Sequence, residues 1–326
     1  MNRIDQLFQT KSSRILSIYF CAGCPTPDGT AATIQALQEA GVDMIEIGIP
    51  FSDPLADGPV IQQAATTALR GGMSLRRLFD QLADIRRMVQ IPLLLMGYLN
   101  PILQFGFEAF CQRCRACGID GLIIPDLPLR EYREHYQATA ERYGLHVVML
   151  VTPETSDERV REIDRHTGGF IYMVSSAAVT GAQRSFDEQK QAYFRRIDSL
   201  RLKHPRLVGF GISNKATFEA ACRASSGAII GSRFVTLLSE AGGDAALAIA
   251  RLKEIQGLRD NASTVMDTIT DEAYLSEARV VFADIEAATE AAERVKEKAG
   301  EIAEKVKREN SFFGKLRGLG DIIMND

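Results

Sequence analysis

The sequence predicts an α/β protein built as an eight-stranded β/α barrel. Eight short runs rich in Ile, Val, Leu and Phe recur along the chain, and stretches with helical periodicity separate them. The runs are apolar on both faces, as the strands of a covered parallel sheet are. Eight such strands alternating with helices over about 250 residues fit a closed barrel better than an open doubly wound sheet.

The predicted strands follow one another at intervals along the chain. They are ILSIYF (15–20), DMIEIGI (43–49), IPLLLMGY (91–98), GLIIPD (121–126), HVVMLV (146–151), GFIYMVSS (169–176), RLVGFGIS (206–213) and GAIIGS (227–232). Helical patterns between them include TAATIQALQEAG, SLRRLFDQLADIRRMV, REYREHYQATAERYG, SDERVREIDRHTG and NKATFEAACRAS. In such a barrel the chemistry lies where strands end and the following loops begin.

Two regions of different character divide the chain into a predicted catalytic barrel, 1–258, and an acidic helical extension, 259–326. The extension holds 10 Lys or Arg and 15 Asp or Glu, out of 38 and 42 in the whole chain. Its apolar positions recur at alternating steps of four and three: Val281, Ile285, Ala288, Ala292, Val295, Ala299, Ile302 and Val306. This spacing is typical of a coiled coil, although many of the positions are Ala, and a solvated helix on the barrel remains an equal alternative.

Composition excludes several classes of function. With 46% hydrophobic and 25% charged residues and no apolar run of roughly 20 residues, the chain reads as globular, with no membrane partner. The first residues lack the apolar core of a secretory signal, so a cytoplasmic location is the default. The net charge of −4 and the absence of a basic cluster argue against a nucleic-acid partner.

Six cysteines include C-x-x-C spacings at Cys21 and Cys24 and at Cys111, Cys114 and Cys117. Such spacing occurs in redox and metal sites. However, Phe110, Cys114 and Cys117 recur at helical spacing, and a free Cys packs as a small hydrophobe, so we favour packing.

Carboxylates in EIGIPFSDPLADGP are the first candidates for chemistry. Glu46 falls within an apolar strand, where alternation points it into the barrel, and burial raises a carboxyl pKa toward the range of a general acid or base. Asp57 lies in the following loop, where it would meet the same substrate. The alternatives are a structural hydrogen bond for Glu46 and a charge at a helix start for Asp57 or Asp53.

Glycines at the ends of the last two strands suggest a phosphate site. Gly211 lies in GFGIS and Gly231 in GAIIGSRF, where backbone N–H groups would approach an anion and Ser232 would add a hydroxyl. Alternatively, these glycines only permit tight turns. Tyr172, at the end of the sixth strand, is either a proton donor or a core aromatic, and the small residues after it suit a lid.

The stretch EIGIPFSDPLADGPVIQ, together with MGYLNP, IIPDLP, VTG, GFGIS and the late GS, closely resembles the tryptophan synthase alpha subunit family from about residue 3 to 257. The resemblance implies a lyase that cleaves indole-3-glycerol phosphate by a retro-aldol reaction to indole and glyceraldehyde 3-phosphate. It implies no metal and no organic cofactor. It also implies a pyridoxal-phosphate-dependent beta subunit as partner, in a heterotetramer.

The resemblance assigns roles residue by residue. Glu46 matches the proton-transfer residue, Asp57 the acceptor of the indole N–H, and Tyr172 the active-site tyrosine. The positions implied for substrate binding are Tyr19, Thr180, Gly181, Phe210, Gly211, Gly231 and Ser232. The positions implied for the beta-subunit interface are Pro50, Asp53, Asp126 and Pro128.

This chain departs from the family pattern in two places. The loop after strand six reads SSAAVTG where the family commonly has S-R-S-G-V-T-G, so Ser176 replaces Arg and Ala178 replaces Gly. Thr180 and Gly181 remain, and a contact between Thr180 and Asp57 is expected on lid closure. The acidic extension is the second departure.

Two other functions stay open on the sequence. One is another phosphate-binding barrel enzyme such as an indole-glycerol-phosphate synthase, which would need a catalytic Lys at a strand end; the eight runs contain none. The other is a barrel retained mainly to activate or scaffold the beta subunit.

Overall fold

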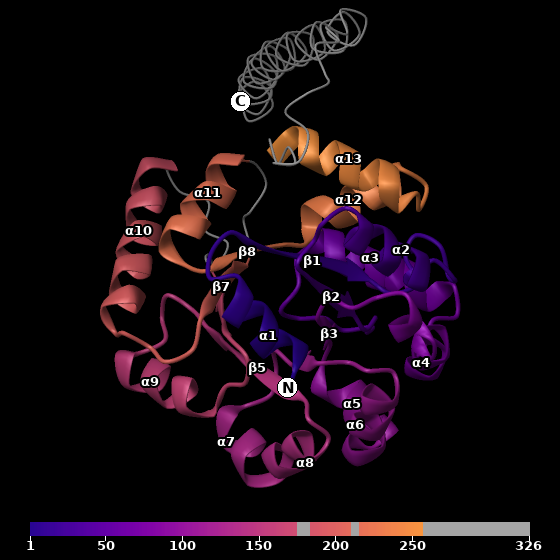
Figure 1. Cartoon of the computed structure of the whole chain (residues 1–326), viewed down its shortest axis with the longest axis horizontal. Helices are drawn as coiled ribbons and strands as arrows, with labels where there is room; N and C mark the ends of the chain where they lie inside the picture. Colours follow the sequence, from indigo (N-terminus) through magenta and orange to yellow (C-terminus); the bar gives the residue numbers. More distant parts are fainter. Residues whose placement is uncertain (175–182, 210–214, 257–326) are drawn as a thin grey trace, which may run out of the picture. The chain divides into compact units, whose positions relative to one another are not determined.

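The computed structural model describes residues 1–174, 183–209 and 215–256, and its centre is a closed barrel of eight parallel strands (Figure 1). Each strand pairs with the next in sequence, and β8 returns to β1, with Ile15 opposite Gly227. The strands are β1 (Ile15–Cys21), β2 (Met44–Gly48), β3 (Leu93–Met96), β4 (Gly121–Ile123), β5 (His146–Val151), β6 (Ile171–Val174), β7 (Arg206–Gly209) and β8 (Gly227–Ile230). The predicted barrel and all eight predicted strands are confirmed.

Helices surround the barrel (Figure 1). They are α1 (Arg3–Thr10), α2 (Thr30–Glu39), α3 (Pro59–Arg70), α4 (Leu75–Leu82), the 3-10 turn η1 (Ile85–Arg87), α5 (Leu99–Phe105), α6 (Phe107–Ala116), α7 (Leu129–Glu131), the π-helical segment η2 (Tyr132–Tyr136), α8 (Gln137–Arg142), α9 (Asp157–His166), α10 (Gln183–Ser199), α11 (Lys215–Ala224), α12 (Ser232–Glu240) and α13 (Ala245–Gln256). Within the described residues, no helix is long and apolar enough to cross a membrane.

Local sequence explains where several helices begin. The Ser74 and Ser156 hydroxyls accept hydrogen bonds from the backbone N–H groups of Arg77 and Arg159, which caps α4 and α9. α3 begins with Pro59 directly after Gly58, a position where the missing N–H of proline costs nothing. The loop after β2 therefore ends at Gly58, and the helix begins at the next residue.

Two predicted helices differ from a single regular α-helix. The pattern at 74–89 forms α4 and then the short turn η1, where Arg86 donates to the carbonyls of Gly118, Val89 and Ile91. The pattern at 130–144 forms one continuous helical segment, in which α7, the π-helical η2 and α8 follow without a gap. Periodicity predicts the helical character of both segments but not the turn or the π-helical stretch.

Cysteines of α6 belong to the packing between the helices and the barrel. Cys111 and Cys114 are fully buried, and Cys117 is nearly so. Beside them the rings of Phe79 and Phe110 lie 5.6 Å apart between centroids. Burial raises the pKa of the Cys111 thiol to about 12, so it stays protonated near neutral pH. These features fit the packing role that we favoured.

Asp120 ties together the amino-terminal end of the barrel. Its side chain is 4% exposed and accepts from the Arg3 guanidinium at 3.0 Å, from the Arg86 guanidinium, and from the backbone N–H of Leu93 at 2.9 Å. Its own carbonyl accepts from the Asn2 side chain at 2.8 Å. One carboxylate thus joins the chain start, η1, β3 and β4.

The chain divides into two compact units, Met1–Arg259 and Asp260–Asp326. The described residues all belong to the first unit. The predicted helical extension, 259–326, lies outside the described residues, and its boundary and role stay predictions.

Replacing Asp120 with Ala should lower the free energy of unfolding by about 3–5 kcal/mol, because the largely buried Arg86 guanidinium would lose its carboxylate partner. Urea unfolding followed by circular dichroism measures the change.

Asp80→Ala is the matched control. It removes the ion pair between Asp80 and Arg113, in which the Asp80 side chain is 75% exposed. The free energy of unfolding should fall by less than about 1 kcal/mol. Equal losses in the two variants would contradict a special role for Asp120.

Candidate active site

Glu46 lies on β2 with its carboxyl group fully buried, as strand alternation predicts. The Ser17 hydroxyl on β1 donates to Oε1 at 2.9 Å. The other oxygen, Oε2, is buried and has no hydrogen-bond partner among the described residues. Burial raises the pKa of Glu46 to about 8, and the Ser17 hydrogen bond opposes this rise. Near neutral pH, therefore, the group is mainly a neutral acid with one oxygen unpaired.

Asp57 lies in the loop between β2 and α3, half-buried. The Tyr98 hydroxyl donates to its Oδ2 at 2.8 Å, and the backbone N–H of Ala56 donates to the Tyr98 oxygen at 2.9 Å. Burial raises the pKa of Asp57, and the Tyr98 hydrogen bond opposes the rise. Tyr98 thus anchors the loop at two points and fixes one carboxylate oxygen.

Tyr172 and Tyr19 place two phenols beside these carboxyls. Both side chains are buried. Burial raises the pKa of Tyr172 well above its usual value, and the charges of Glu46 and Asp57 raise it further. Since β6 and β2 are not neighbours in the sheet, this interaction runs across the barrel interior. The structure therefore brings Glu46, Asp57 and Tyr172 together.

Glycines on the adjacent strands make room for the two phenols. A Cβ atom on Gly48 would lie 2.2 Å from the Tyr19 hydroxyl oxygen, and one on Gly209 would lie 2.2 Å from that of Tyr172. These distances exclude any side chain at either position unless the tyrosine moves. Each phenol thus rests directly on the backbone of its neighbouring strand.

The candidate phosphate residues are described only in part. Gly231 precedes α12 directly, close to Tyr19, and Ser232 is the first residue of that helix. The first N–H groups of a helix can bind an anion, so this end of β8 suits a phosphate. Thr180, Gly181, Phe210 and Gly211 lie outside the described residues.

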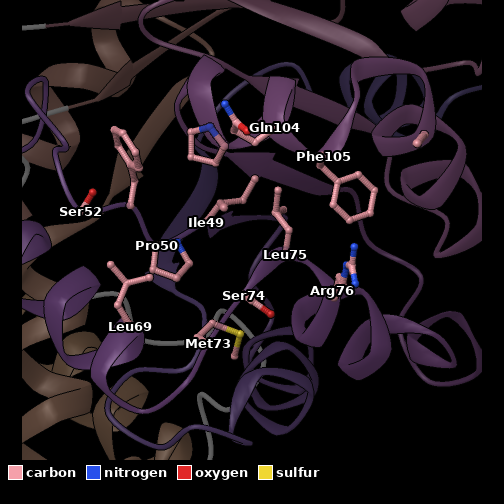
Figure 2. A pocket seen from close by; sticks show the side chains of 13 residues that line it. Ile49, Pro50, Ser52, Leu69, Met73, Ser74, Leu75, Arg76, Gln104 and Phe105 are labelled. Atoms are coloured by element: carbon pink, nitrogen blue, oxygen red, sulfur yellow. The ribbon is translucent and has the colours of Figure 1, made fainter.

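The residues predicted for partner contact lie in two loops, Pro50 and Asp53 after β2 and Asp126 and Pro128 after β4. Asp53 is exposed, and the Asp126 carboxylate accepts from the backbone N–H of Leu99, which ties the loop after β4 to the start of α5. Pro128 directly precedes α7. Pro50 lines an open cavity of about 660 Å³, together with Met73, Leu75, Gln104 and Phe105 (Figure 2). Glu46 and Asp57 do not line this cavity.

Ser17 and Tyr98 are functional candidates that sequence reasoning missed. Each is a hydroxyl residue in or directly after an apolar strand. That interruption was the available signal, but the carboxyl partner of each lies 29 or 41 residues away and cannot be identified from local pattern. Within the described residues, no group of three or more His, Cys, Asp or Glu side chains is arranged to hold a metal ion.

Known proteins with similar sequences share one description. A family model described as tryptophan synthase alpha chain matches residues 6–264. The tryptophan synthase alpha chain of Bacteroides fragilis is 66% identical over 261 residues, which cover 80% of this chain and 99% of the relative. That of Flavobacterium johnsoniae is 58% identical over 242 residues, 74% of this chain and 95% of the relative.

A solved structure carries the same description. The crystal structure of the tryptophan synthase alpha chain of Legionella pneumophila matches with a TM-score of 0.70 at 32% identity, covering 81% of this chain and all of that chain. A shared barrel, a family model spanning most of the chain and relatives of such high identity agree. The chain therefore belongs to the tryptophan synthase alpha chain family.

Proposed function

We propose that Glu46 and Asp57 carry the reaction of this chain. The reaction itself follows from family membership: the chain cleaves indole-3-glycerol phosphate in tryptophan biosynthesis, working with a beta subunit. The single observation that supports these two residues is the contrast between their surroundings. Glu46 is fully buried with one unpaired oxygen, whereas Asp57 lies in a half-buried loop.

Cleavage of the carbon–carbon bond needs a proton on indole C3, stabilisation of charge at the ring nitrogen, and removal of the proton from the side-chain hydroxyl. Neutral Glu46 donates its proton to C3. As the bond breaks, the resulting Glu46 carboxylate accepts the hydroxyl proton, which forms the aldehyde and restores the neutral acid. Protons therefore balance without a net exchange with water.

Asp57 supplies the charge stabilisation. In its ionised form Asp57 accepts a hydrogen bond from the indole N–H. Its negative charge lowers the energy of the positively charged ring that forms when C3 is protonated. The hydrogen bond from Tyr98 favours this ionised form and holds one oxygen, which leaves the other for the substrate. Asp57 and Glu46 thus enter the reaction in opposite protonation states.

The remaining predicted residues hold the substrate. Tyr172, protonated because burial and the two carboxyls raise its pKa, acts as a hydrogen-bond donor in the interior, and Tyr19 packs against the indole ring. Gly231 and Ser232 bind the phosphate at the start of α12. Phe210, Gly211, Thr180 and Gly181 keep their predicted roles in phosphate binding and lid closure.

The beta subunit docks, in this proposal, on the loop after β2 and the segment 126–128. The observation that supports this site is the exposure of Leu55, which follows Pro54 in the proline-rich loop and is 92% exposed. So large an apolar side chain in water gains free energy on burial by a partner. Asp53 is exposed in the same loop, and Asp126 and Pro128 are exposed in the loop after β4, whereas Pro50 is buried at the start of the loop after β2. Assembly as a heterotetramer and a cytoplasmic location stay predictions.

Glu46→Gln should reduce indole release from indole-3-glycerol phosphate by at least about a thousandfold, because an amide can neither donate nor accept the proton. The assay follows indole with and without a beta subunit. Glu108→Gln, on the exposed surface of α6, is the control and should keep full activity. Turnover retained by Glu46→Gln would remove this residue from the mechanism.

The pH dependence of kcat/KM should follow the neutral form of Glu46. Because burial raises its pKa to about 8, the titration of Glu46 should leave activity unchanged below about pH 7 and lower it roughly tenfold per unit above about pH 8. Protonation of Asp57, whose pKa burial also raises, would lower activity only at the acid end of the profile. Steady-state rates of indole release between pH 6 and 10 measure the profile, with circular dichroism to exclude unfolding. A rate that instead rises through pH 8 would show that the carboxylate is the required starting form.

Leu55→Ser should weaken binding of the beta subunit by about tenfold or more, since a buried leucine contributes roughly 1.5–3 kcal/mol. Met88→Ser is matched, because Met88 is also an exposed apolar residue, 49% exposed, but it precedes β3 at the amino-terminal end of the barrel. Calorimetric titration gives both affinities. Equal affinity for the two variants would place the interface elsewhere.

A further inference from the structure

Ser17 is a fully buried hydroxyl residue in the middle of the apolar strand β1. Along this strand it lies two residues before Tyr19, so both side chains point to the same face. Tyr19 is the register partner of Glu46 on β2, which brings Ser17 beside the same carboxyl. A hydroxyl in such a place is unfavourable unless it is hydrogen-bonded, and its partner is Glu46 Oε1 at 2.9 Å.

The hydrogen bond makes the two carboxyl oxygens of Glu46 unequal. Oε1 is held by Ser17, whereas Oε2 is buried without a partner in the described part of the chain. Asp57 shows a parallel arrangement, in which the Tyr98 hydroxyl holds Oδ2. In each case one hydroxyl group restrains one oxygen and fixes the direction of the other.

We propose that Ser17 is a positioning residue that holds Glu46 Oε1, so that Oε2 is the oxygen that exchanges protons with indole-3-glycerol phosphate. This inference rests on the proposed role of Glu46 in proton transfer. Ser17 does not itself touch the reacting atoms. It restricts the rotation of the carboxyl group and favours its ionised form, the form that accepts the hydroxyl proton in the second half of the reaction.

Thr and Val replacements at position 17 separate the hydroxyl from the volume of the side chain. The two residues have nearly the same shape, so any cost of the added methyl group in this buried site is common to both. Only Thr keeps the donor to Glu46. A role limited to filling space would therefore leave the two variants alike, and thermal unfolding of both shows whether they fold equally well.

Ser17→Val should lower kcat about tenfold relative to Ser17→Thr, with KM nearly unchanged, because a less well oriented carboxyl affects the chemical step and not the affinity. The pH at which activity falls by half should also be about one unit higher in the Val variant. This sign follows because loss of a hydrogen bond to the carboxylate raises the pKa of Glu46. Equal kcat and equal pH profiles in the two variants would overturn the proposal.

Infrared difference spectroscopy gives a measurement that is independent of turnover. The carboxyl C=O band that disappears in Glu46→Gln reports the protonation of Glu46, and its titration midpoint should lie higher in Ser17→Val than in Ser17→Thr. The same midpoint in both would overturn the proposal. If the proposed role of Glu46 itself fails, Glu46→Gln keeps its activity; if only the role of Ser17 fails, Glu46→Gln is inactive while the Val and Thr variants behave alike.

Discussion

The burial of one carboxyl group inside a closed barrel is the constraint on which the site depends. Eight parallel strands enclose the interior, where Glu46 is fully buried and, within the described residues, its side chain receives a hydrogen bond from Ser17 on one oxygen only. Between about pH 4.5 and about pH 8 the folded chain keeps a proton on Glu46 that the unfolded chain has released. The free energy of unfolding therefore falls as the pH rises through this range, and it falls no further on account of Glu46 above about pH 8. This loss of stability comes from the group to which the proposed function assigns proton transfer.

Asp120, directly before β4 at the amino-terminal end of the barrel, is a buried carboxylate with the opposite surroundings. It is almost as buried as Glu46, yet two arginines and a backbone N–H satisfy it, and the result is a cross-link among the chain start, η1, β3 and β4. The amino-terminal end of the barrel thus carries a fully paired charge that supports the fold. Glu46, in the middle of β2, is by contrast an incompletely paired group, and the proposed function assigns the chemistry to it. Stabilisation at the amino-terminal end follows the general pattern of β/α barrels.

Sequence reasoning predicted what depends on local pattern. Apolar runs revealed all eight strands, and alternation within β2 placed Glu46 in the interior. It could not predict the break after α4, where Arg86 donates to three carbonyls, or the π-helical stretch within 129–142. Nor could it identify the roles of Ser17 and Tyr98, whose partners are distant in the chain. The packing of Tyr19 on Gly48 and of Tyr172 on Gly209 was also missed, because it depends on the register between neighbouring strands.

The seating of two phenols on bare backbone has a consequence for the range of substrates. Where a tyrosine ring lies against a glycine, the tyrosine side chain, which can be replaced by a shorter one, limits the space inside the barrel at that point. Exchanging Tyr19 or Tyr172 for a smaller residue would open space down to the glycine of the neighbouring strand. On the proposed placement of the indole beside Tyr19 and Tyr172, larger, ring-substituted indoles would enter there, so these two positions are starting points for redesign toward unnatural indole analogues.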